Sequence, residues 1–166
     1  MKRHLLILLT LFAFSSCIKE GKEGANLKVG DRLPSFSVQM NDGSIVSDAD
    51  LVGETSVVMF FHTSCPDCQK ALPRMQRVYD EYLAKGVRFV LISRAEGAGS
   101  IADFWSQNSL TMPYSPQEDR TVYELFAQER IPRIYINDKN GIIRAIFTDN
   151  PVPEYSDIKS ALDSSF

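Results

Sequence analysis

Two apolar runs separated by one helix-length segment constrain the fold of this chain more than any other feature. The runs, "SVVMFF" at 56–61 and "VRFVLIS" at 87–93, are β-branched and aromatic throughout, as expected of strands buried on both faces. Between them, residues 66–85 repeat apolar side chains at helical spacing, and Gly86 follows as a stop signal. This strand–helix–strand unit requires a parallel pair joined by a right-handed crossover.

The flanking segments complete one α/β domain. "FSVQMNDGSIV" at 36–46 surrounds an Asn-Asp-Gly turn signal and predicts an N-terminal β-hairpin. A second hairpin is expected from "RIYIN" (133–137), "DKNG" (138–141) and "IIRAIF" (142–147). Helices are expected at 100–107, at 121–128 and from Pro153 to Leu162. The predicted fold is a central mixed β-sheet flanked by helices on both faces.

The first seventeen residues have the layout of an export signal. "MKRHLLILLTLFAFSSC" begins with Lys2 and Arg3, continues with a short apolar stretch, and reaches small residues just before Cys17. The stretch resembles a bacterial lipoprotein signal, which implies cleavage before Cys17 and a lipid on its sulfur. An ordinary secretory signal and an uncleaved anchor are the alternatives, and all three place the domain outside the cytoplasm. We expect a signal peptide at 1–16, the lipidated cysteine and a flexible tether at 17–27, and the folded domain at 28–166.

The charge balance argues against nucleic acid as a partner. The formal net charge is −3, and no stripe of Lys and Arg runs along any predicted element. We therefore expect partners of another class.

The two remaining cysteines, in "CPDC" at 65–68, are compatible with three kinds of chemistry. A zinc site needs about four ligands, and besides Cys65 and Cys68 the chain after the signal offers one histidine, so no metal is expected. A structural disulfide across so short a loop would stabilise little. The redox interpretation remains, because Cys65 at a helix N-terminus has a stabilised thiolate and Cys68 lies one turn on, on the same face.

The chain resembles the thioredoxin superfamily, and most of all its extracytoplasmic, membrane-anchored TlpA-like branch. The resemblance lies in "VVMFFHTSCPDCQKALPRM", "VRFVLIS", "RIPRIYINDKNGIIRAIF" and the N-terminal hairpin. It implies a thioredoxin-like fold and a thiol–disulfide oxidoreductase with no cofactor. It also implies that Ile131–Pro132 is the family's cis-proline, where Ile131 offers its backbone to an extended substrate. Pro66 and Asp67 complete the expected substrate-binding residues.

The departures from the family pattern also bear on the site. Ser64 stands where thioredoxins usually have Trp, and Met59 stands where cytoplasmic thioredoxins have a buried Asp. Glu96 falls where some cytochrome-maturation relatives have a glutamate, which implies that it takes the proton from Cys68. The alternative for Glu96 is a solvated loop residue. His62 is expected to be a plain strand-end histidine rather than a catalytic one.

Three functions follow from these residues. The first is a thiol–disulfide oxidoreductase in which Cys65 attacks and Cys68 resolves, acting on disulfides of exported proteins and recharged by a membrane or periplasmic reductant. The second is a peroxide-reducing redoxin, although His62 and Val58 stand where peroxiredoxins have Thr and Pro. The third is a non-enzymatic lipoprotein that uses the fold for binding.

Asp67 is expected to influence the redox potential of the pair. Its carboxylate lies within one turn of Cys65, where a like charge disfavours the thiolate and makes the pair more reducing. The alternative is that Asp67 only stabilises the start of the helix.

Overall fold

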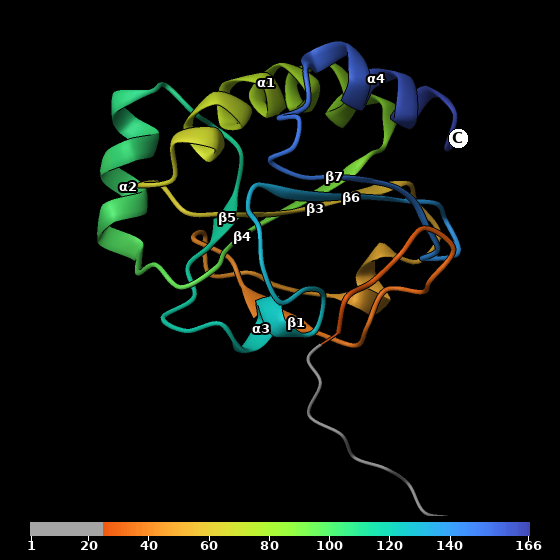
Figure 1. Cartoon of the computed structure of the whole chain (residues 1–166), viewed down its shortest axis with the longest axis horizontal. Helices are drawn as coiled ribbons and strands as arrows, with labels where there is room; N and C mark the ends of the chain where they lie inside the picture. Colours follow the sequence, from red (N-terminus) through yellow and green to blue (C-terminus); the bar gives the residue numbers. More distant parts are fainter. Residues whose placement is uncertain (1–24) are drawn as a thin grey trace, which may run out of the picture.

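The computed structural model describes residues 25–166 and has a five-stranded sheet at its centre (Figure 1). The strand order is β5-β4-β3-β6-β7. The three strands on one side are parallel, and β6 and β7 run antiparallel to their neighbours. The strands are β3 (Ser56–Phe61), β4 (Arg88–Ser93), β5 (Tyr114–Ser115), β6 (Arg133–Asn137) and β7 (Ile143–Phe147). The predicted mixed sheet is confirmed.

The strand–helix–strand unit forms as predicted. All six residues of β3 are buried, because the strand lies in the middle of the sheet with a layer on each face. Helix α1 (Pro66–Tyr82) leads through a 3₁₀ turn, η2 (Leu83–Lys85), to Gly86, whose φ of 87° suits a residue without a side chain. Strand β4 then pairs with β3 in parallel, with Val57 opposite Phe89.

Helices cover both faces of the sheet, as predicted (Figure 1). Helices α1 and α4 (Tyr155–Asp163) lie together on one face, and α3 (Thr121–Glu124) lies on the other with the 3₁₀ helix η1 (Asp48–Leu51). Helix α2 (Ala98–Gln107) flanks the β5 side of the sheet. The N-terminal hairpin, β1 (Ser37–Gln39) and β2 (Ile45–Ser47), forms a separate antiparallel sheet near α3.

Several elements differ from the sequence-based expectation, among them strand β5 and helices α3 and α4. Strand β5 was not predicted, because it is only two residues long. Helix α3 ends at Glu124 instead of 128, and the chain beyond it buries Phe126 against Phe36 and Phe60, with ring centroids 5.5 and 4.8 Å away. Helix α4 begins at Tyr155, so Pro153 lies outside it. Tertiary packing and capping thus set these boundaries, rather than local propensity.

The predicted signal peptide and Cys17 lie outside the described residues. The described end of the predicted tether, 25–27, contacts the domain: Ala25 N–H donates to the Glu124 carbonyl at 3.2 Å, and Leu27 N–H donates to the Phe126 carbonyl at 3.0 Å. The contacts of the folded domain therefore begin before the expected boundary at 28. Within 25–166, no helix combines the length and apolarity needed to cross a bilayer.

Candidate redox site

Cys65 is placed at the start of α1 by a short loop after the central strand. Strand β3 ends at Phe61, and Cys65 is the residue that caps α1, with extended φ and ψ of −81° and 118°. Its N–H donates to the His62 carbonyl at 3.1 Å, and its own carbonyl accepts from Gln69 N–H at 3.0 Å. Pro66 occupies the first turn, where a missing N–H costs nothing. The thiol is partly exposed and sits where the helix dipole favours an anion.

Cys68 is the shielded member of the pair. Its side chain is fully buried inside the first turn of α1, and both cysteines are free thiols in this structure. Burial raises the pKa of the Cys68 thiol well above its ordinary value, and negative charge on Cys65 would raise it further. A backbone hydrogen bond from His62 and the charge of Arg94 oppose this shift only in part. Cys68 is therefore a neutral thiol that needs a base before it can attack.

The loop before β6 brings Ile131 and Pro132 to Cys65. The Ile131–Pro132 peptide bond is cis, as the resemblance implied. The Cys65 thiol contacts the Ile131 carbonyl at an Sγ–O distance of 3.5 Å. The preceding carbonyl, that of Arg130, accepts a hydrogen bond from the Tyr123 hydroxyl at 2.9 Å. The backbone predicted to bind substrate therefore lies directly against the exposed sulfur.

Glu96 is buried beneath the loop that carries Cys65. Its side chain is about 6% exposed, so it is not the solvated loop residue of the alternative interpretation. One carboxylate oxygen accepts the Thr63 N–H at 2.7 Å, and the other accepts the Thr63 hydroxyl. The Glu96 backbone is fixed by pairing with Gln117. The buried Glu96 carboxylate is thus bound to Thr63, two residues before Cys65 in the chain.

The loop contains two contributors whose contacts the sequence did not predict: Thr63, which was not singled out, and Ser64, which was noted only as a departure from the family pattern. Thr63 supplies both hydrogen bonds to Glu96, and Ser64 contacts His62. Their position between His62 and Cys65 was the only available signal. A loop residue that touches a buried carboxylate cannot be identified before the fold brings 63 and 96 together.

Asp67 faces away from the buried part of the site. Its carboxylate is partly exposed and forms an ion pair with Lys70, with an Nζ–Oδ1 distance of 2.9 Å. Pro66 beside it is exposed. This ion pair screens the charge that was expected to act on Cys65.

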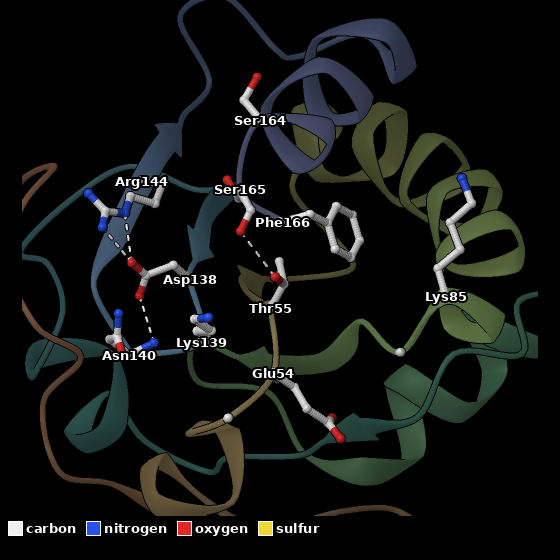
Figure 2. A pocket seen from close by; sticks show the side chains of 12 residues that line it. Glu54, Thr55, Lys85, Asp138, Lys139, Asn140, Arg144, Ser164, Ser165 and Phe166 are labelled. Atoms are coloured by element: carbon white, nitrogen blue, oxygen red, sulfur yellow. Dashed lines mark hydrogen bonds and ion pairs between the residues drawn. The ribbon is translucent and has the colours of Figure 1, made fainter.

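A cavity of about 690 Å³ lies at the opposite end of the sheet (Figure 2). Thr55, which precedes β3, lines this cavity, whereas Cys65 follows β3, so the length of that strand separates the two places. The wall of the cavity includes the Arg144–Asp138 ion pair and the Thr55 hydroxyl, which donates a hydrogen bond to the Ser165 carbonyl (Figure 2). Neither cysteine lines this cavity, so its position does not indicate where the cysteines react. No three potential metal ligands cluster anywhere in the described part of the chain.

Comparison with known proteins places this geometry among redox proteins. The sequence model of the AhpC/TSA family matches residues 29–146. The thiol-disulfide oxidoreductase ResA of Oceanobacillus iheyensis is 31% identical over 147 residues, which cover 86% of this chain and 75% of that protein. ResA of Geobacillus thermodenitrificans is 26% identical over 160 residues, covering 96% and 91%.

Solved structures show the same fold. A putative thiol:disulfide interchange protein DsbE from Chlorobium tepidum aligns with a TM-score of 0.75 and 20% identity, over 84% of this chain and 99% of the other. A thiol:disulfide interchange protein of the thioredoxin family from the same species aligns with a TM-score of 0.71 and 22% identity, over 85% and 99%. The predicted thioredoxin-like fold is confirmed.

Proposed function

The chain belongs to the AhpC/TSA family and is a thioredoxin-like thiol–disulfide oxidoreductase, and we propose that it reduces disulfides of exported proteins through Cys65 and Cys68. The observation that carries the proposal is the unequal burial of the pair. One thiol is partly exposed at a helix N-terminus against the Ile131 carbonyl, and the other is buried one turn behind it. An exposed nucleophile with a shielded partner suits attack followed by internal resolution.

In the first step, the Cys65 thiolate attacks one sulfur of the substrate disulfide. A bond forms between Cys65 and that sulfur, the substrate S–S bond breaks, and the second substrate sulfur leaves as a thiolate and takes up a proton. An extended substrate segment would lie along the backbone at Ile131 and Pro132, next to Pro66 and Asp67. Backbone recognition of this kind suits a reductase with many partners.

In the second step, Cys68 resolves the mixed disulfide. Because burial raises the pKa of Cys68, the attack needs a proton acceptor, and we assign that role to Glu96. The Cys68 sulfur bonds to Cys65, and the first substrate sulfur leaves as a thiolate. Two electrons have then moved from the cysteine pair to the substrate, and a membrane or periplasmic dithiol must restore the pair.

The proposal is tested by insulin reduction with dithiothreitol, compared with peroxide consumption by the same preparation. A reductase accelerates insulin precipitation, and the acceleration disappears in Cys65→Ser. Peroxide consumption without insulin reduction would identify a peroxide-reducing redoxin, and neither activity would identify a binding protein. His62 occupies the position where peroxiredoxins carry Thr, which favours the first outcome.

We also propose that the domain is extracytoplasmic and held to a membrane by lipid on Cys17. The support is the basic and apolar start of the chain, followed by Ser15 and Ser16 directly before that cysteine. Metabolic labelling with a fatty acid should mark the wild type and leave Cys17→Ala unlabelled. Label that persists in Cys17→Ala would contradict the anchor.

A further inference from the structure

His62 makes contacts on two sides that favour opposite protonation states. Its ring nitrogen Nδ1 accepts the Ser64 N–H at 3.2 Å and lies 2.9 Å from the Ser64 hydroxyl. The same nitrogen lies 3.7 Å from a carboxylate oxygen of Glu96. The ring is about 27% exposed, so it can exchange protons with solvent.

A single nitrogen cannot accept the Ser64 N–H and donate a proton to Glu96 at the same time. To accept the Ser64 N–H, Nδ1 must be unprotonated, and the neutral ring then carries its proton on Nε2. An imidazolium has a proton on Nδ1, which repels the Ser64 N–H and can be donated to the Ser64 hydroxyl or attracted by the Glu96 carboxylate. Imidazole side chains commonly change charge between pH 5 and 8.

The other groups around His62 connect a change in its protonation to the two cysteines. The backbone of His62 hydrogen-bonds the thiol of Cys68, and its carbonyl accepts the Cys65 N–H. From the end of β4, Arg94 donates its backbone N–H to Phe61, and its charge lies within electrostatic reach of Cys68. Glu96 is the acidic group facing the ring, and it already holds Thr63.

We propose that His62 is a positioning residue for the redox pair, which accepts the Ser64 N–H of the Cys65 loop when neutral and loses that hydrogen bond when protonated. The inference rests on the proposed function, because it assigns Cys65 the attacking role. With the neutral ring, the Ser64 N–H is satisfied and the thiol is presented in one geometry. With the charged ring, the loop loses that hydrogen bond and Glu96 is engaged in an ion pair.

Protonation of His62 slows both steps of the reaction. A loop that has lost the Ser64 hydrogen bond presents Cys65 less often in the attacking geometry. A Glu96 carboxylate that is paired with an imidazolium is a poorer acceptor for the Cys68 proton. The result is a reductase whose turnover falls when His62 becomes protonated.

Two measurements test the proposal on the full-length reduced protein in detergent. The first follows the His62 ring and the Ser64 amide by NMR from pH 5 to 8. The second measures iodoacetamide alkylation of Cys65, read from the mass of the peptide that carries it, in a Cys68→Ser background. The variants are His62→Ala, which removes the acceptor, and His62→Asn, which keeps an acceptor near Nδ1 but carries no charge. Gln69→Ala is the control, because Gln69 Nε2 braces the same loop through the Thr63 carbonyl at 2.8 Å and does not titrate.

The Ser64 amide should shift with the same midpoint as the His62 ring. At pH 8 the background protein should alkylate about fivefold faster than His62→Ala, the effect of one hydrogen bond. This ratio should fall as pH is lowered, because a protonated ring no longer accepts the Ser64 N–H. His62→Asn should stay near the background rate at pH 8, and the ratio for Gln69→Ala should not change with pH.

A Ser64 amide that ignores the His62 titration, or a ratio for His62→Ala that is constant with pH, overturns the proposal. The NMR titration needs only the wild type, so it decides the question even if a variant does not fold. Neither measurement uses a substrate. Failure of the insulin assay with the expected titration would therefore refute the reductase function and leave the positioning role intact.

Discussion

The two ends of helix α1 are built in opposite ways. At the N-terminal end, Cys65 caps the helix without a side-chain cap hydrogen bond, and its sulfur makes a long contact with the Ile131 carbonyl. At the C-terminal end, a dense polar network ties α1 to α4. Its bonds run from Tyr155 and Lys159 to Glu81, from Lys85 to Glu81, from Lys159 to Tyr82, and from Tyr82 to Asp163.

The N-terminal end of α1 carries the reactive cysteine, and the C-terminal end holds the helix in place. A nucleophile must exchange partners in every turnover, so few fixed contacts at Cys65 suit its role. The helix that carries it still needs a fixed position, and the network around Glu81 provides it 16 residues away. Substitutions at the first end should therefore change reactivity at nearly constant stability, and substitutions at the second end should do the reverse.

The largest expected effect comes from the two cysteines. Cys65→Ser should abolish insulin reduction, because it removes the exposed nucleophile. Cys68→Ser should leave the attack intact and accumulate mixed disulfides with partner proteins, visible on non-reducing gels. Cys65→Ser should unfold at nearly the wild-type temperature, whereas Cys68→Ser places a hydroxyl in a fully buried position and should unfold at a lower one. Equal trapping by the two variants would reverse or remove the assignment of attacking and resolving thiols.

Glu96→Gln should slow resolution by about 100-fold at neutral pH, because general bases typically contribute 10²–10⁴-fold. The loss should shrink as pH rises, since burial raises the pKa of Cys68 and higher pH then forms its thiolate without a base. The measurement is the release of a chromogenic thiol from a mixed disulfide at Cys65. Glu118→Gln, which alters an exposed carboxylate beside Gly97, is the control. Equal rates in the Glu96 and Glu118 variants would exclude Glu96 as the base.

At the other end of α1, Glu81→Gln should lower the melting temperature by a few degrees and leave insulin reduction unchanged. Hydrogen bonds from Tyr155, Lys159 and Lys85 lower the pKa of Glu81 from 4.5 to about 2. A carboxylate with a lowered pKa stabilises the fold at pH values above its ordinary pKa. For Glu81, this contribution to stability is lost as the pH falls from 4.5 towards 2. The gap between wild type and variant in thermal scans should therefore close over that range.

Solvent screening keeps the stability effect modest, because the Glu81 side chain is about one-third exposed. Glu54→Gln provides the control, since Glu54 forms a long ion pair with Arg88 at 3.8 Å on the exposed surface. A melting temperature that falls equally in both variants would show that the network around Glu81 has no special supporting role.

The smallest expected effect is that of Asp67→Asn on the redox potential. We expect the wild-type potential to lie nearer the roughly −270 mV of thioredoxin than the roughly −120 mV of DsbA. Removing the Asp67 charge should favour the Cys65 thiolate and raise the potential, but by no more than about 10 mV because Lys70 already screens that charge. Lys70→Gln should shift the potential the other way. Equilibration with glutathione buffers measures both, and a shift of several tens of millivolts in Asp67→Asn would show that the ion pair does not screen.

The parts of the fold that the sequence predicted well are those with a strong local pattern. Strand β3 and the N-terminus of α1 were predicted to the residue, because a buried run, a proline at the first helical position and a regular apolar spacing all agree there. Helix α3 was predicted too long, because its later residues follow the packing of Phe126 rather than helical propensity.

The candidate site divides in the same way. The cysteine pair and its position at a helix N-terminus follow from spacing alone. The contacts of Glu96 with Thr63, and of Ser64 with His62, depend on side-chain directions in a loop. His62 illustrates the limit: the pattern around it indicated a plain strand-end residue, and only the coordinates place it between Ser64 and Glu96.

The strand order of the sheet also bears on how this protein folds during its synthesis. Strand β3 is completed on one side by β4, which follows within the same local unit, and on the other side by β6, which arrives only at residues 133–137. Pairings between such distant segments close long loops and tend to form slowly. A chain that is still emerging during synthesis, or one cut before residue 131, would thus carry both cysteines without the backbone that faces them. We expect such fragments to behave as two ordinary thiols, prone to wrong pairings, so that selective chemistry with other proteins begins only when the last third of the polypeptide has joined the sheet.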